Sequence, residues 1–377
     1  MITVLKKYRK IIIIAVFAVA LAAAGFFIKN YLDAKNDPSQ PAEALLDNPT
    51  STAALPDANA DEASKPVLKK ISEQPVFDFF SISSSTEEMI YVTPAGEVFR
   101  ASDNEDDRLS QQTFNALNSI APSPDGRKIL AAFGDPSQPQ WLIFDLAEKV
   151  WRPIPNTISQ AVWGNDDKEI IAVSRQNLIR LKINQNAFTE EVLWRNFSFQ
   201  DVNLIFLPPQ TVLIAEKPAF FHEGRAWEFN FKTAELSAVF GPAPGLFIRQ
   251  ATDRSTILKF DDIDDLSIIN RGRIIHYETL PSKCEMSQGI PYCFLPLGRP
   301  DGINWPDDYF QKNFYTEDQL FIFDEQGARL IDLETSEKID GLKPIRRQNA
   351  LYFINRRDNS LYRLSPLDQP AAAPLSD

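Results

Sequence analysis

Residues 121–130 read APSPDGRKIL, and this stretch decides the fold of the chain. An apolar strand end leads through a Pro-Asp-Gly corner and two basic residues into a second apolar strand. A similar stretch, VWGNDDKEII, follows 41 residues later at 162–171. A period of about 40–45 residues is typical of the four-stranded blades of a β-propeller. The residues that mark the two repeat corners are Ser123, Pro124, Asp125, Gly126, Asn165 and Asp166.

The same pattern extends over residues 67–366, where short runs rich in Phe, Ile, Leu, Val, Tyr and Trp alternate with clusters of turn residues. We take the second strand of each unit as a marker and find seven. The markers are Met89, Ile129, Ile170, Val212, Ile257, Tyr292 and Leu351. The sequence therefore predicts an all-β fold, a propeller of seven four-stranded blades, with a count good to within one (six to eight).

The last unit ends soon after Leu364 and lacks an outer strand of its own. Residues 67–71, VLKKI, form a spare strand ahead of the first unit. We expect this strand to complete the seventh blade, because pairing the two ends of the chain closes the ring and removes free sheet edges.

The Ser-Pro-Asp-Gly corner, followed by a basic residue and an apolar strand, resembles the TolB-type, WD-repeat-like β-propeller family. The hairpin from Cys284 to Cys293 and the Trp-Pro-Asp-Asp run at 305–308 also resemble exported, membrane-anchored bacterial propeller proteins of uncharacterised function. The resemblance implies binding of a protein or ligand on a rigid ring. It implies no fixed activity, because propellers carry many functions.

The N-terminal region predicts a membrane anchor. Residues 1–10 form a basic tail and residues 11–28 an uninterrupted apolar run, long enough for a transmembrane helix. By the positive-inside rule the tail is cytoplasmic and the propeller lies outside the cytoplasmic membrane, in the periplasm or extracellular space. A cleaved signal peptide ending near Ala22–Ala24 is the alternative. Residues 29–66, rich in Ala and Pro, predict a disordered linker, and residues 367–377 a disordered tail.

Cys284 and Cys293 are the two cysteines of the chain. In an oxidising compartment we expect them to form one disulfide across a hairpin. Two reduced, buried thiols are the alternative if the domain is cytosolic.

The sequence contains no recognisable catalytic motif. It has no nucleophile elbow, no phosphate-binding Gly-rich loop and two isolated histidines, His222 and His276. The acidic runs at 103–107 and 261–265 do not match a calcium-binding loop. We therefore expect no catalytic residues, no metal and no cofactor. The net charge of −12 disfavours nucleic acid as a partner.

Residues 298–316 interrupt the sixth unit without a strand pattern, and long loops of this kind often bind ligands. The loop combines aromatic and acidic side chains that suit a sugar ring or a basic peptide. We expect Trp305→Ala to weaken capture with little effect on thermal unfolding; the alternative is a private cap over the blade. The candidate binding residues are Trp305, Asp307, Asp308, Tyr309, Phe310 and Tyr315.

Residues 336–366 carry seven basic and three acidic side chains, on a chain that is acidic overall. They predict either a docking face for an acidic partner or, more simply, solvated strand flanks.

Together these features predict a membrane-tethered propeller that acts as a binding or scaffold module for an envelope protein or glycan. The sequence leaves its oligomeric state open. The alternative function is a carbohydrate-active lyase or hydrolase that uses acidic residues at the propeller channel.

Overall fold

The computed structural model describes residues 66–367 apart from eight short gaps, at 83–86, 103–104, 185–186, 263–264, 269–272, 276–277, 299–301 and 325–326. The predicted basic tail, transmembrane helix and linker lie outside the described residues, except for Pro66. Within the described part of the chain, no helix is both long enough and apolar enough to cross a membrane.

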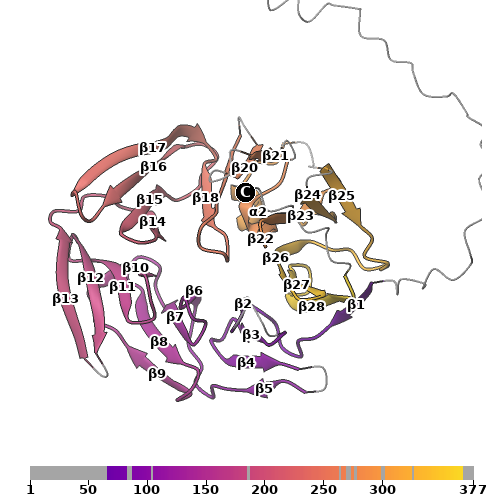
Figure 1. The fold of residues 1–377 in the computed structure, drawn as a ribbon, viewed down its shortest axis with the longest axis horizontal. Helices are drawn as coiled ribbons and strands as arrows, with labels where there is room; N and C mark the ends of the chain where they lie inside the picture. Colours follow the sequence, from indigo (N-terminus) through magenta and orange to yellow (C-terminus); the bar gives the residue numbers. More distant parts are fainter. Residues whose placement is uncertain are drawn as a thin grey trace, which may run out of the picture. The chain divides into compact units, whose positions relative to one another are not determined.

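The described strands form seven four-stranded antiparallel sheets arranged as the blades of a ring (Figure 1). The sequence-based prediction of a seven-bladed, all-β propeller is thus confirmed. Blade 1 contains β2–β5, blade 2 β6–β9, blade 3 β10–β13, blade 4 β14–β17, blade 5 β18–β21 and blade 6 β22–β25. Blade 7 contains β26–β28 and β1.

The first strand of each blade lies nearest the centre of the ring (Figure 1). These inner strands are β2 (Asp78–Ser81), β6 (Leu117–Pro122), β10 (Ile158–Trp163), β14 (Val202–Leu207), β18 (Phe247–Gln250), β22 (Cys284–Ser287) and β26 (Gly341–Arg347). The second strands are β3 (Met89–Val92), β7 (Lys128–Phe133), β11 (Glu169–Ser174), β15 (Thr211–Glu216), β19 (Ile257–Asp261), β23 (Ile290–Pro296) and β27 (Ala350–Asn355).

The third strands are β4 (Val98–Ala101), β8 (Gln140–Asp145), β12 (Asn177–Asn184), β16 (Glu223–Asn230), β20 (Asp265–Ile268), β24 (Asp318–Asp324) and β28 (Ser360–Ser365). The outer strands are β5 (Asp107–Arg108), β9 (Val150–Pro153), β13 (Ala187–Trp194), β17 (Glu235–Pro244), β21 (Arg273–Ile275), β25 (Gly327–Ile331) and β1 (Val67–Lys70). In the part of the chain that the structure describes, two short helices, η2 (Pro281–Lys283) and α2 (Asp307–Phe310), lie between strands.

The ring is closed by the pairing of β1 with β28, as the sequence predicts. Val67 lies opposite Ser365 and Lys70 opposite Tyr362, and Figure 1 shows the indigo β1 beside the yellow β28. The predicted end of the propeller needs a correction of one residue. Leu367, assigned to the disordered tail, is buried in the core between blades 6 and 7, and its amide donates to the carbonyl of Asn349.

The corner at 123–126 is built from local hydrogen bonds. Ser123 Oγ donates to Asp125 Oδ1 at 2.6 Å and accepts the amide of Lys128 at 2.9 Å. Gly126 has a φ of +71°, and a Cβ at this position would lie 2.6 Å from the carbonyl oxygen of Ile82. Only glycine satisfies both the backbone angle and this close approach to blade 1.

The second repeat corner, at 165–168, shows what its polar turn residues do. Asp166 Oδ1 accepts the amide of Lys168 at 2.8 Å, and the neighbouring Asp167 receives Lys128 Nζ from blade 2 at 2.6 Å. The turn residues therefore shape their own corner and also join adjacent blades. The apolar core follows the same arrangement, because most of its clusters lie between the facing sheets of neighbouring blades.

Cys284 on β22 and Cys293 on β23 lie directly opposite each other and form a disulfide, with Cα atoms 4.1 Å apart. Both residues are buried in the core. The expected hairpin disulfide is therefore present in the structure.

Candidate functional site

The insertion at 298–316, described except for residues 299–301, places part of its aromatic set inside the molecule. Trp305 and Tyr309 are 0% and 1% exposed, and they pack with Phe260 of blade 5 and Leu280. Their rings are stacked, with centroids 5.5 Å apart. These two candidate binding residues therefore cannot contact a ligand at the surface, and they lie where the cap alternative places them.

The other candidate residues of the insertion remain partly accessible. Phe310 and Tyr315 are 43% and 42% exposed. Asp307 Oδ1 accepts the amide of Phe220 from blade 4 at 3.1 Å. Asp308 accepts the amide of Asn304 and the side chain of Asn313, each at 2.8 Å, and these two bonds lower its pKa. Both carboxylates thus fix the loop itself.

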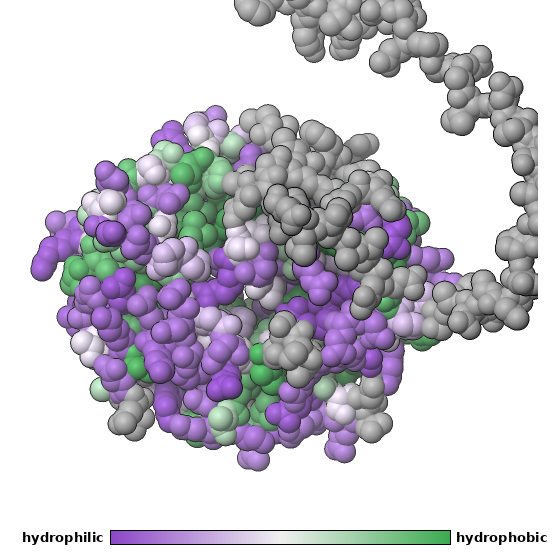
Figure 2. Space-filling view, in the orientation of Figure 1, coloured by the Kyte–Doolittle hydropathy of each residue, from purple (hydrophilic) through white to green (hydrophobic). Residues whose placement is uncertain are grey.

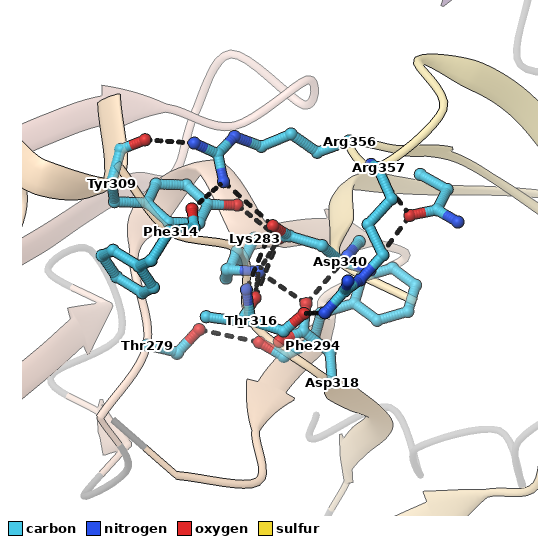
Figure 3. A network of polar contacts seen from close by, with 12 residues as sticks. Thr279, Lys283, Phe294, Tyr309, Phe314, Thr316, Asp318, Asp340, Arg356 and Arg357 are labelled. Carbon is cyan, nitrogen blue, oxygen red and sulfur yellow. Dashed lines mark hydrogen bonds and ion pairs between the residues drawn. The ribbon is translucent and has the colours of Figure 1, made fainter. Parts of the chain in front are cut away.

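A buried polar network fastens the insertion to blades 6 and 7 (Figure 3). Lys283, on η2, has a fully buried side chain whose Nζ donates to Thr316 Oγ1, Asp318 Oδ2 and Asp340 Oδ1 at 2.9, 2.5 and 2.7 Å. Tyr309 donates its hydroxyl to Asp340 Oδ1 at 2.7 Å. Arg356 completes the network through Asp340 Oδ2, at 2.9 Å, and the carbonyl of Phe314, at 3.0 Å.

The charges of this network balance, because the cations Lys283 and Arg356 are matched by the carboxylates Asp318 and Asp340. Burial alone would lower the pKa of Lys283, but the charges of Asp318 and Asp340 outweigh burial and raise it. Burial likewise would raise the pKa of Asp340, yet Lys283, Tyr309 and Arg356 together lower it by more. Burial raises the pKa of Tyr309, so its hydroxyl stays protonated and able to donate. With its side chains sealed from solvent, this network acts as a structural fastening.

The accessible candidate site is the axial cavity, a space of about 740 Å³ at the centre of the ring. Side chains and turns from blades 1, 2, 3, 5 and 7 line it, mostly at the carboxyl ends of the inner strands. Its volume lies within the range of small-molecule sites. Hydrophilic residues predominate near the centre of the face shown in Figure 2.

The insertion leaves blade 6 at the face of the ring opposite to the repeat corners that border the axial cavity. The repeat corners that border the cavity join first and second strands, whereas the insertion joins β23 to β24, the second and third strands. In an up-and-down blade these two kinds of connection lie at opposite ends of the strands. The predicted binding loop and the axial cavity are therefore separate candidates. From the sequence, binding residues were predicted only for the loop, and the channel was predicted only as the place of the alternative lyase or hydrolase site.

Most basic residues of the segment 336–366 are not solvated strand flanks, and Lys338 and Arg357 are the exposed ones. Lys343 Nζ contacts Asp78 of blade 1 at 2.7 Å, and Arg346 donates to the Tyr292 hydroxyl of blade 6 at 2.6 Å. Arg356 belongs to the buried network, and Arg347 lines the axial cavity. The positive charge of this segment is thus directed largely into the ring.

The remaining candidates from the sequence do not assemble into a site. The described side chains include no cluster of three or more His, Cys, Asp or Glu residues that could hold a metal ion. Asp261 pairs with Lys259, and Asp106 accepts the hydroxyl of Tyr91. His222 is exposed and lies 3.3 Å from Glu216, while His276 lies outside the described residues.

No family model matches the chain, and no curated protein matches its sequence. Solved structures resemble its fold. The β-propeller domain of Cps50 (Swd1) from Myceliophteria thermophila matches with 11% identity and a TM-score of 0.47, over 80% of this chain and 100% of that one. A catalytically inactive virginiamycin B lyase from Staphylococcus aureus with quinupristin matches with 8% identity and a TM-score of 0.49, over 80% and 99%.

TolB from Acinetobacter baumannii is also similar, with 12% identity and a TM-score of 0.36, over 74% of this chain and 61% of that chain. At such low identities the likeness concerns the fold alone.

Proposed function

We propose that the chain is a membrane-tethered binding module whose propeller captures an envelope protein or glycan outside the cytoplasmic membrane. The observation that carries the binding role is the axial cavity, a space of about 740 Å³ that residues of five blades line and on which polar side chains from four of them converge. A rigid ring that holds groups from distant parts of the sequence in fixed positions is well suited to recognition.

The tethering part of the proposal rests on the apolar run at 11–28 and the basic residues before it. The disulfide between Cys284 and Cys293 is consistent with an oxidising compartment.

The same cavity favours binding over hydrolysis. Asp78 and Asp125 are the carboxylates among its described lining residues. Asp78 is paired with Lys343, and Asp125 accepts the Ser123 hydroxyl at 2.6 Å within its own corner. A glycosidase needs two carboxylates that flank a substrate, and these two are engaged in structural contacts.

The test is a pull-down from native membranes with the full-length chain tagged at its C-terminus. Thr252, at the rim of the cavity, is replaced by Trp to obstruct the mouth. The matched variant carries Phe310→Ser and Tyr315→Ser on the insertion. We expect Thr252→Trp to abolish capture and the insertion variant to retain it. The opposite pattern would move the site to the insertion, and capture of nothing by the wild type would contradict the binding role.

A further inference from the structure

The axial cavity is rich in positive charge although the chain carries a net charge of −12. Its lining includes four basic and two acidic side chains. The basic side chains are Arg249, Arg254, Lys343 and Arg347, and the acidic side chains are Asp78 and Asp125. A concave site whose sign opposes that of the whole chain concentrates ligands of negative charge.

Two of the four cations are already neutralised by contacts between blades. Lys343 Nζ lies 2.7 Å from Asp78 Oδ1 and also donates to the carbonyl of Phe79. Arg249 contacts Glu285 Oε2 at 2.8 Å and donates to the carbonyls of Pro281 and Cys284. These two side chains hold blades 7 and 1, and blades 5 and 6, together.

The other two, Arg254 and Arg347, form no ion pair with a described carboxylate; Glu285, which is paired with Arg249, acts on Arg347 only from beyond ion-pair distance. Arg254 reaches across the ring and donates to the carbonyl of Gly164 in blade 3, at 2.6 Å. Within the described part of the chain, Arg347 donates only to the carbonyl of its neighbour Arg346, at 2.8 Å, and its buried Nε has no hydrogen-bond partner. Both residues are half-buried, and burial lowers the pKa of both guanidinium groups, an effect that the charge of Glu285 partly offsets at Arg347.

A guanidinium that is partly desolvated and lacks a counter-ion is unfavourable until an anion approaches it. Its planar set of N–H donors matches the oxygens of a carboxylate or a phosphate. We infer that the axial cavity binds an oxyanionic group, a carboxylate or a phosphate, through Arg254 and Arg347. This inference rests on the proposed binding function and names the chemical group of the ligand that the cavity recognises.

The experiment is calorimetric titration of the full-length chain, at low ionic strength and neutral pH, with inorganic phosphate in one series and citrate in another. We expect saturable binding in at least one series, and the stronger series identifies the preferred oxyanion. Arg347→Gln is the first variant, because among the described residues its side chain donates only to the carbonyl of the adjacent Arg346, so its loss should leave the fold intact. Its affinity should fall about tenfold, the effect of one charge-assisted hydrogen bond.

Arg254 requires a gentler change because it also joins two blades. Arg254→Lys keeps the charge but removes the planar donor set, and we expect it to weaken binding while the melting temperature stays near that of the wild type. Arg329→Gln is the matched control. Arg329 is exposed on β25, so this variant loses one charge far from the cavity and should bind like the wild type.

Equal affinities of the wild type, Arg347→Gln and Arg254→Lys would overturn the inference, as would the absence of binding in both series. The two proposals fail separately. If Thr252→Trp abolishes capture while the arginine variants capture normally, the binding role stands and the oxyanion site falls. If the anions bind as expected but Thr252→Trp captures normally, the oxyanion site stands and the proposed function falls.

Discussion

Lys283 shows how a single side chain determines the local architecture. A lysine without solvent exposure is unfavourable unless its charge is compensated, and here Asp318 and Asp340 compensate it from two different blades. One carboxylate begins β24 and the other precedes β26, so the ammonium group fastens blade 6 to blade 7. Tyr309 extends the fastening to the insertion.

Removing the buried charge of Lys283 should lower the free energy of unfolding by more than removing an exposed lysine. Lys283→Met leaves two buried carboxylates without their shared partner, and we expect the free energy of unfolding to fall by about 3–5 kcal/mol. Lys338→Met is the matched control, because Lys338 is 64% exposed and its ion pair with Glu317 should contribute less than about 1 kcal/mol. Urea titrations followed by far-UV circular dichroism measure both. Similar losses in the two variants would contradict the role assigned to Lys283.

Asp340 provides a prediction about pH. Lys283 and the hydrogen bonds to Asp340 hold its pKa below the ordinary value despite burial. A carboxyl whose pKa is lowered by folding stabilises the protein above the unfolded-state pKa of about 3.9, and this contribution is lost as the pH falls through the lower, folded value.

The stability advantage of the wild type over Asp340→Asn should therefore be constant near neutral pH and shrink below about pH 4. Urea midpoints of both proteins, measured over a pH series, give the difference. Asp201→Asn removes an 88% exposed carboxylate and is the control, for which we expect no such dependence. If the advantage grew on acidification, folding would raise the pKa of Asp340 rather than lower it.

The residue scale also shows what sequence can and cannot predict. The corner at 123–126 was predictable because its hydrogen bonds join residues no more than five positions apart. The network around Lys283 was not, because its partners lie 33, 35 and 57 residues away. The signal that did exist was the excess of basic residues at 336–366, but several of their acceptors, such as Asp78 for Lys343 and Tyr292 for Arg346, are supplied by other blades.

At the scale of elements, the insertion was recognisable as an interruption of the repeat. Which of its aromatic residues face inward was not recognisable, because the surface they pack against comes from other blades. Phe260 belongs to blade 5 and Leu280 precedes η2, and these contacts decide that Trp305 and Tyr309 are buried. The spacing of the aromatic residues within the loop carries no information about this.

Burial reverses the sequence-based expectation for Trp305→Ala. Removing a fully buried indole should leave a cavity and lower the free energy of unfolding by about 3–5 kcal/mol. Trp305→Phe is the matched variant, since the buried Nε1 of Trp305 has no hydrogen-bond partner to lose and most of the ring is retained. We expect a loss of about 1–2 kcal/mol for this variant. Chemical unfolding measures both, and an unchanged Trp305→Ala variant would contradict the packing described here.

At the scale of the whole molecule, polar side chains join neighbouring blades around the axis. Trp163 Nε1 donates to the carbonyl of Ala121 at 2.9 Å, and Gln250 donates to that of Phe206 at 2.8 Å. The blade repeat and its closure were predictable from the sequence, because each depends on a local pattern. The chemistry of the cavity was not, because its residues are spread over more than 270 positions, from Phe77 to Ile354.

Closure by β1 predicts that the ring unfolds as one unit. Leu68 on β1 is half-buried and packs against the core between blades 6 and 7, whereas Val67 is 64% exposed. Leu68→Asp should lower the free energy of unfolding by about 1–3 kcal/mol, because it places a charge against apolar side chains. Val67→Asp should change it by less than about 0.5 kcal/mol.

The decisive measurement compares two probes of Leu68→Asp. Five of the six tryptophans lie in blades 2, 3 and 4, and the sixth, Trp305, in the insertion, so the fluorescence reports mainly on regions outside blade 7. If closure couples all blades, the fluorescence and far-UV circular dichroism transitions shift together and by the same amount. If the blades instead behave as a chain of nearest neighbours, blade 7 should unfold first, and the two transitions should separate while the fluorescence midpoint stays at its wild-type value. Separation would show that β1 completes a sheet without making the ring cooperative.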